Sequence, residues 1–188
     1  EDVQAIVEDT FYLPYANSKM EQNMLESAKK SVDMYFEKNK ADFKNIEMAE
    51  ADIELDMGDG VKVNGRIDLV KHREISGEEK ITIVDFKTAD RDVTQCLEAE
   101  QLKIYALGYQ ELTGKSADYL EILNLDKVES ERVRVTEGLT ETVAKDIRNA
   151  AQNIRENKLD RKCSKEKCSA CYLNYLCLSK EEKKTYVE

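Results

Sequence analysis

The sequence predicts an α/β domain in which helices flank a central mixed β-sheet. Three observations support this fold class. The spacing of apolar residues changes from a helical period to strict alternation and back again. A chain of 188 residues is long enough for one domain with a substantial core, and only 7 Gly and 1 Pro interrupt it. We expect a single domain with an N-terminal helical part (1–45), a central core (46–157) and a Cys-rich tail (158–188).

An amphipathic helix is expected over 18–37. Ser18 and Glu21 match an S-x-x-E capping box at its start. The apolar residues that follow keep helical spacing, and we interpret them as ordinary packing residues: Met20, Met24, Ala28, Val32, Tyr35 and Phe36.

Three strands are expected next. Apolar and polar residues alternate over 53–57 and over 61–67, and Gly58-Asp59-Gly60 between them predicts a hairpin turn. A β-branched run over 81–86 predicts a buried third strand.

The second half of the chain continues with helices and strands. Helical spacing returns over 96–113 and stops at Gly114. Two further strands are expected over 119–125 and 132–135, and a last helix over 139–157.

The charge and the hydropathy limit the class of protein. The net charge is −10, but the tail from Arg155 onward holds nine basic and six acidic residues. An acidic body suits a site that gathers a divalent cation, and it equally suits plain solubility. No segment approaches the roughly 20 apolar residues of a membrane span, and no signal peptide is recognisable. We expect a soluble, cytoplasmic protein, and because the chain begins with Glu1 we interpret it as part of a longer one.

Two carboxylates and a lysine end neighbouring strands. Asp85 and Lys87 point to one face because side chains alternate along a strand. Asp68 ends the preceding strand, and an antiparallel arrangement would bring it alongside Asp85. Close carboxylates favour Mg²⁺ between them, and such an ion can polarise a phosphoryl oxygen. Spacing alone still favours the plainer interpretation of a surface Asp–Lys pair.

Three motifs in a fixed order add to this pattern: Gly65-Arg66-Ile67-Asp68, then Ile83-Val84-Asp85-Phe86-Lys87-Thr88, then Gln101-Leu102-x-x-Tyr105. This set resembles the PD-(D/E)xK nuclease superfamily, and within it the RecB-like branch of helicase–nucleases and CRISPR-adaptation nucleases. The likeness spans about 46–177 and is far more specific than a lone D-x-K. It implies a restriction-endonuclease-like core and a metal-dependent DNA nuclease.

The resemblance also implies residue roles. Asp68, Asp85 and the Phe86 carbonyl would bind Mg²⁺ or Mn²⁺, and Lys87 would be the catalytic lysine. Gln101 and Tyr105, at i and i+4 of one helix, would line the site and contact DNA or the attacking water. Without the resemblance, these two would be interpreted as a solvated helix residue and a core aromatic. Weaker candidates for an extra ligand are Glu50 and Glu54.

The partners implied by the resemblance are DNA, as single strands or duplex ends, and a helicase module in the same chain or complex. Exonuclease activity is the form expected, in DNA repair or recombination. One departure matters: RecB-like nucleases carry a His on the first helix, whereas His72, the one His here, follows Asp68. The helical His lies in missing sequence, or Glu21 or Glu26 replaces it, or metal binding is weakened. In the last case the domain would act as a DNA-binding or structural module.

The tail contains four of the five cysteines: Cys163, Cys168, Cys171 and Cys177. Such a cluster in a chain without export signals is more often metal-binding than disulfide-bonded. Cys168-x2-Cys171-x5-Cys177 resembles the C-terminal part of the iron–sulfur motif of RecB-like nucleases, which implies a [4Fe–4S] cluster. Cys163 would be the fourth ligand, or that ligand lies upstream of this chain, and Cys96 is a poorer candidate. Zinc is the alternative, and either metal would form a structural clasp for the tail.

Overall fold

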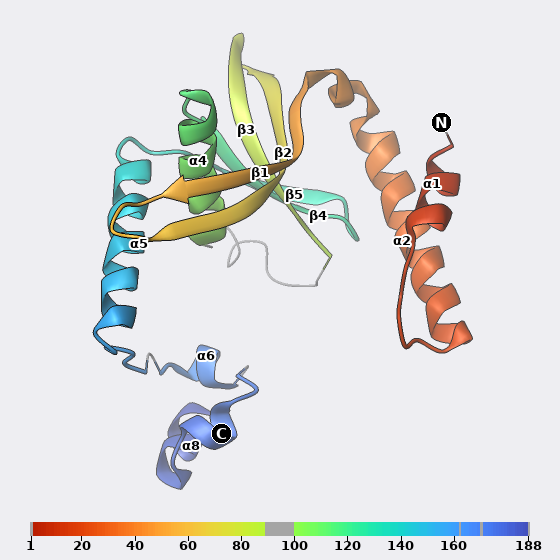
Figure 1. Cartoon of the computed structure of the whole chain (residues 1–188). Helices are drawn as coiled ribbons and strands as arrows, with labels where there is room; N and C mark the ends of the chain where they lie inside the picture. The colour runs from red at the N-terminus through yellow and green to blue at the C-terminus, as the bar shows by residue number, and fades with distance from the viewer. Residues whose placement is uncertain (1, 89–99, 162, 170, 188) are drawn as a thin grey trace. The chain divides into compact units, whose positions relative to one another are not determined.

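The computed structural model describes residues 2–88, 100–161, 163–169 and 171–187 (Figure 1). The chain forms two compact units, Glu1–Arg148 and Asn149–Glu188. The expected division into 1–45, 46–157 and 158–188 within one nuclease domain stays a prediction. In the part that the structure describes, no helix is long and apolar enough to cross a membrane.

A five-stranded mixed sheet organises the first unit (Figure 1). Its strands lie in the order of the sequence: β1 (Ile46–Asp56), β2 (Lys62–Ile75), β3 (Glu78–Lys87), β4 (Tyr119–Asn124) and β5 (Glu129–Arg134). The pair β3–β4 is parallel and the other three pairs are antiparallel. Parallel neighbours require a crossover connection, usually a helix, and the connection here contains α4 (Glu100–Thr113). The predicted α/β fold with a mixed, helix-flanked sheet is confirmed.

The helices differ from expectation mainly at their ends. An additional short helix, α1 (Val3–Thr10), precedes α2 (Ser18–Asn39), and a 3₁₀ segment η1 (Lys40–Asn45) follows. The predicted capping box at Ser18 is wrong. The N-cap is Asn17, whose side chain accepts from Met20 N at 2.9 Å, and Asn is as good a cap as Ser. Residues 96–99 of the predicted helix 96–113 lie outside the described part.

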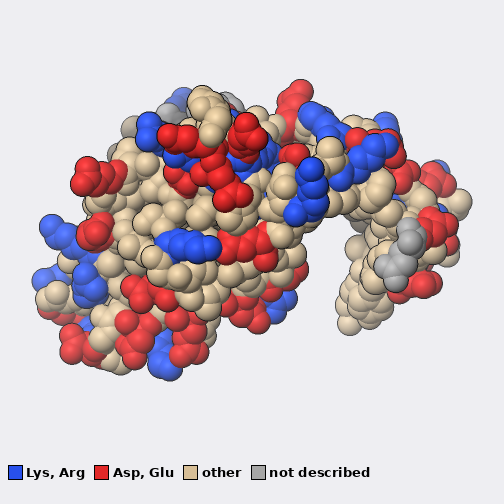
Figure 2. All heavy atoms as spheres, turned by 90° about the horizontal axis from the view of Figure 1, so that it is seen from above, with Lys and Arg blue, Asp and Glu red and all other residues tan. Residues whose placement is uncertain are grey.

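The last helices are α5 (Leu139–Arg155) and three short ones in the tail, α6 (Lys165–Ser169), α7 (Asn174–Cys177) and α8 (Lys180–Tyr186). A capping box does occur here: Ser179 and Glu182 satisfy each other's backbone N–H at the start of α8. On the face of the molecule that Figure 2 shows, Asp and Glu side chains are interspersed with Lys and Arg. A mixture of both charges on this face is what a chain with a net charge of −10 is expected to show.

The main core lies between α4 and one face of the sheet. It contains Ile53, Ile67, Val70 and Ile83 from the strands and Leu102, Tyr105, Ala106 and Tyr109 from α4. Two glycines allow the close approach of helix and sheet. A Cβ at Gly108 of α4 would lie 3.1 Å from two atoms of Ile53, and one at Gly65 of β2 would lie 3.4 Å from the Tyr105 ring. This packing fixes where α4 begins relative to the ends of β2 and β3.

Candidate active site

The sheet opens at the end of β3. The ladder between β2 and β3 ends at Leu69↔Val84, whereas β3 continues beside β4 as far as Lys87↔Asn124. Residues 85–87 therefore lack the β2 backbone as a neighbour. A side chain takes its place, because the Phe86 N–H donates to Asp68 Oδ2 at 2.7 Å. The expectation that Asp68 ends its strand is wrong, because β2 continues to Ile75. Asp68 was expected alongside Asp85, and its carboxylate bonds to the amide of the next residue, Phe86.

The backbone of Phe86 points toward the opened edge. In a strand, the N–H and C=O of one residue lie on the same edge, so the Phe86 carbonyl faces the side on which Asp68 lies. The carbonyl of the next residue faces the other side, since Lys87 C=O accepts from Leu125 N at 2.8 Å. One carboxylate and one carbonyl thus converge on the gap between the strands.

Asp85 and Lys87 form a close ion pair on the α4 side of β3. Lys87 Nζ lies 2.6 Å from Asp85 Oδ2, and the Asp85 side chain is only 3% exposed. Burial raises the pKa of Asp85, the Lys87 ammonium opposes that rise, and the charge of Asp68 adds to it. A buried carboxylate with a second carboxylate nearby is a place where a bound cation would stabilise the ionised form.

Gln101 and Tyr105 extend this contact chain onto α4. Lys87 Nζ donates to Gln101 Oε1 at 3.3 Å, and Gln101 Nε2 donates to the Tyr105 hydroxyl at 2.6 Å. Both plainer interpretations hold in part, because Gln101 is exposed and Tyr105 is a core residue at 7% exposure. The geometry nevertheless joins both side chains to Lys87. Gly108, which lets this helix lie close to the sheet, has no recognisable signal in the sequence.

The donor set fits a hard divalent cation. Asp68, Asp85 and the Phe86 carbonyl offer oxygen only, and Mg²⁺ binds through one or two carboxylates while it keeps several waters. Within the described ranges, no three His, Cys, Asp or Glu side chains gather to hold a metal ion. A cation here would therefore depend on two carboxylates, a carbonyl, water and substrate oxygens.

The weaker ligand candidates have other contacts. Glu50 and Glu54 are exposed and pair with Arg66 at 3.8 Å and Lys62 at 2.8 Å. The His72 ring Nε2 lies 2.9 Å from Glu47 Oε2, and His72 pairs with Ile81 in the middle of the β2–β3 ladder. On α2, Glu21 is exposed, and Glu26 accepts from Gln22 at 3.4 Å.

None of the four tail cysteines forms a disulfide with another described residue. Cys163 and Cys168 lie close enough for their thiols to interact. Burial, a hydrogen bond between the Cys163 and Cys168 thiols, and the nearby Cys177 raise the pKa of the Cys163 thiol. The iron–sulfur and zinc interpretations both stay predictions, and Cys96 lies outside the described residues.

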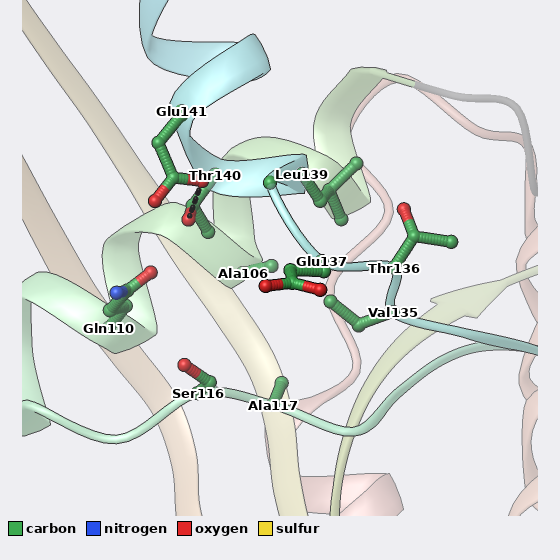
Figure 3. Close-up of a pocket in the computed structure, with 11 residues that line it drawn as sticks. Ala106, Gln110, Ser116, Ala117, Val135, Thr136, Glu137, Leu139, Thr140 and Glu141 are labelled. Atoms are coloured by element: carbon green, nitrogen blue, oxygen red, sulfur yellow. Dashed lines mark hydrogen bonds between the residues drawn. The ribbon is translucent and has the colours of Figure 1, made fainter.

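A pocket elsewhere in the first unit is separate from the carboxylates. Its volume is about 280 Å³, and it lies between α4, the segment before β4 and the start of α5 (Figure 3). Gln110 and Ser116 lie on one side of it, and Thr140 donates to Glu141 at 3.3 Å on another. None of the predicted site residues lines this pocket.

Comparison with known proteins identifies the family. The family model described as the PD-(D/E)XK nuclease superfamily matches residues 2–178, nearly the whole chain. A solved structure, the crystal structure of SSO0001, is similar at 18% sequence identity and a TM-score of 0.46. The match covers 85% of this chain and 77% of that one. No curated protein matches. With its motifs gathered where β2 and β3 separate, this chain belongs to the PD-(D/E)XK nuclease superfamily.

Proposed function

We propose that this protein is a Mg²⁺- or Mn²⁺-dependent DNA nuclease whose catalytic centre is formed by Asp68, Asp85 and Lys87. Membership of the superfamily indicates a metal-dependent nuclease. The observation that carries the assignment of residues is a pair of contact series that meet at the end of β3. One runs from Asp68 to the Phe86 amide, and the other from Asp85 through Lys87 to Gln101.

Each residue has a distinct task in this proposal. Asp68, Asp85 and the Phe86 carbonyl would hold the metal, which when bound polarises a phosphoryl oxygen and acidifies a bound water. Lys87 would orient the attacking water and offset charge that develops on the phosphoryl group. An ammonium has three N–H donors, and contacts within the described residues use two of them, to Asp85 and Gln101. Among the described residues nothing uses the third donor, which would serve a water or a phosphate oxygen.

Gln101 and Tyr105 would keep the lysine in place. An ammonium can only donate, so Gln101 presents Oε1 to Lys87 and Nε2 to the Tyr105 hydroxyl. Tyr105 is anchored in the core, which restricts the Gln101 amide and through it Lys87. Preorganisation of this kind lowers the cost of holding the reacting groups in position.

The finer parts of the proposal rest on the order of the motifs. That order supports the RecB-like branch, an exonuclease acting on single strands or duplex ends, and a helicase module in the same chain or complex. The spacing of Cys168, Cys171 and Cys177 supports a structural [4Fe–4S] cluster, with Cys163 as the fourth ligand and zinc as the alternative.

A second candidate function is a nuclease-fold domain that binds DNA without cutting it. The observation that favours it is the absence of a third acidic or His ligand beside the two carboxylates among the residues described. The deciding experiment incubates the folded protein with Mn²⁺ and linear single-stranded, linear duplex or circular duplex DNA.

The variants in that experiment are Asp85→Asn and Lys87→Ala, with Glu78→Gln at the other end of β3 as the matched control. We expect both site variants to lose at least about 100-fold in rate, and the control to keep wild-type activity because exposed Glu78 pairs only with Lys80 among the contacts described. Cleavage of linear but not circular DNA would support an exonuclease. A folded wild-type protein that binds DNA and cuts none of the three would favour the second candidate.

A further inference from the structure

A small apolar cluster lies on the face of the sheet opposite α4. Leu69, Val84 and Leu123 are buried there, and Phe86 packs against them. Because side chains alternate along β3, the Phe86 ring points to this face while Asp85 and Lys87 point to the other. Phe86 thus offers its carbonyl to the proposed metal site and its ring to the cluster behind it.

Tyr35 of α2 holds that ring from the other side. The two rings meet edge to face, with centroids 5.4 Å apart and an interplanar angle of 84°. This is a favourable aromatic geometry, and it is more directional than aliphatic packing. Tyr35 therefore restricts how far the Phe86 side chain can move away from the sheet.

The Tyr35 contact is one of few that attach α2 to the sheet region. None of the 22 residues of α2 is buried. Beyond Tyr35, Lys38 donates to the Val128 carbonyl and Ser31 donates to Asp126 at 3.2 Å. These partners lie in the turn between β4 and β5, whereas Tyr35 alone among the three reaches the strand that carries the site residues.

A buried ion pair acts on the Tyr35 hydroxyl through its charges. Glu121 is 1% exposed, and Arg73 Nη2 lies 3.1 Å from its Oε1. Burial, followed by the charge of Glu121, raises the pKa of the Tyr35 hydroxyl, so the ring stays neutral at physiological pH. Tyr35 is thus in ring contact with Phe86 and within range of these buried charges.

We propose that Tyr35 is a positioning residue for the metal site: its ring fixes the Phe86 ring and thereby the Phe86 carbonyl at the opened edge of β3. The α1–α2 hairpin would then set metal affinity without supplying a metal ligand. This inference rests on the proposed nuclease function. Groups that orient metal ligands typically contribute 10–100-fold in metal affinity or activity.

The test compares two neighbouring aromatic residues of α2. Tyr35→Ala removes the ring that meets Phe86. Phe36→Ala removes a half-buried ring whose centroid lies 5.2 Å from that of Phe43. Tyr35→Phe keeps the ring, and Tyr35→Leu keeps apolar cover if Tyr35→Ala unfolds. Mn²⁺ binding to each full-length chain is measured by the electron paramagnetic resonance signal of free Mn²⁺, without DNA or turnover.

We expect the Mn²⁺ dissociation constant to rise about tenfold in Tyr35→Ala and Tyr35→Leu, the lower end of the range for such groups. It should stay within about twofold in Tyr35→Phe and Phe36→Ala. In cleavage assays the Mn²⁺ requirement should shift by the same factor, with kcat at saturating Mn²⁺ and the KM for DNA unchanged. Equal Mn²⁺ affinity in Tyr35→Ala and wild type, or an equal loss in Phe36→Ala, would overturn the inference alone. Wild-type binding no tighter than that of Asp85→Asn would overturn the proposed metal site itself.

Discussion

The close approach of α4 to β1 predicts the effect of a single methyl group. A Cβ added at Gly108 would lie 3.1 Å from Ile53 Cβ and Cγ2, and closer still to Ile53 Cδ1. Carbon atoms at optimal contact are about 3.5–4.0 Å apart, so Gly108→Ala overpacks the core. Overpacking costs about 1–3 kcal/mol, and the better helix propensity of Ala offsets about 1 kcal/mol of that. We expect a net loss of up to about 2 kcal/mol, which lowers Tm by up to about 8 °C in a chain of this size.

Thermal or urea unfolding measures this loss, and a second substitution identifies its cause. Ile53→Val removes Cδ1, the atom nearest the added methyl. Gly108→Ala should therefore cost less in the Ile53→Val background, with a coupling energy of at least about 0.5 kcal/mol. Glu111→Ala, on the exposed side of the same helix, should change stability by less than about 0.5 kcal/mol. If Gly108→Ala instead stabilises the protein, α4 is not held close to β1, and the argument that this packing positions Gln101 fails.

Three further predictions concern ionisation and the tail. Burial raises the pKa of Asp85, so the native state holds that proton more tightly than the unfolded chain. Stability then falls as pH rises above the ordinary value of 3.8. Asp85→Asn should accordingly raise the Tm of the metal-free protein at pH 7, and a lower Tm would contradict this. Burial and the hydrogen bond to Glu47 raise the pKa of Tyr109 to about 12, so wild-type stability should fall between pH 10 and 12 more steeply than that of Tyr109→Phe. That variant should also lose about 1.5–3 kcal/mol at pH 7, the value of a hydrogen bond to a charged group, as urea titration would show. Anaerobically purified protein should absorb at about 400 nm, and this iron–sulfur band should be lost in Cys171→Ser. Bound zinc without colour would favour the zinc site, and a protein without bound metal would contradict both metal sites.

Much of the sheet could be predicted because local sequence determines it. The alternation over 53–57 and 61–67 and the turn between them correspond to β1 and β2. The placement of Asp85 and Lys87 on the same face of β3 also follows from the alternation of side chains along a strand. Lys87 Nζ does lie 2.6 Å from Asp85 Oδ2. These features depend on side-chain pattern within a few residues.

The features that could not be predicted depend on partners far along the chain. β5 begins at Glu129 and not at 132, because its first residues, Glu129-Ser130-Glu131, are polar and become a strand only by pairing with β4. Helix α1 is only 8 residues long, so its apolar residues Val3, Ile6 and Val7 are too few to predict a helix, and its stability comes from packing against α2. The fit of Gly108 over Ile53 joins residues 55 positions apart.

The separation of β2 from β3 is the same kind of long-range feature, and it changes how the carboxylates should be tested. Asp68 not only faces the proposed metal site but also satisfies the Phe86 N–H that the β2 backbone no longer reaches. An unpaired buried N–H costs about 1–3 kcal/mol, so Asp68→Ala would disturb the end of β3 whether or not Asp68 binds metal. Asp85 makes its described contact with Lys87, a side chain on its own strand. Loss of activity in Asp85→Asn therefore reports on chemistry at the site, whereas loss in Asp68→Ala combines chemistry with the local structure that holds the Phe86 carbonyl.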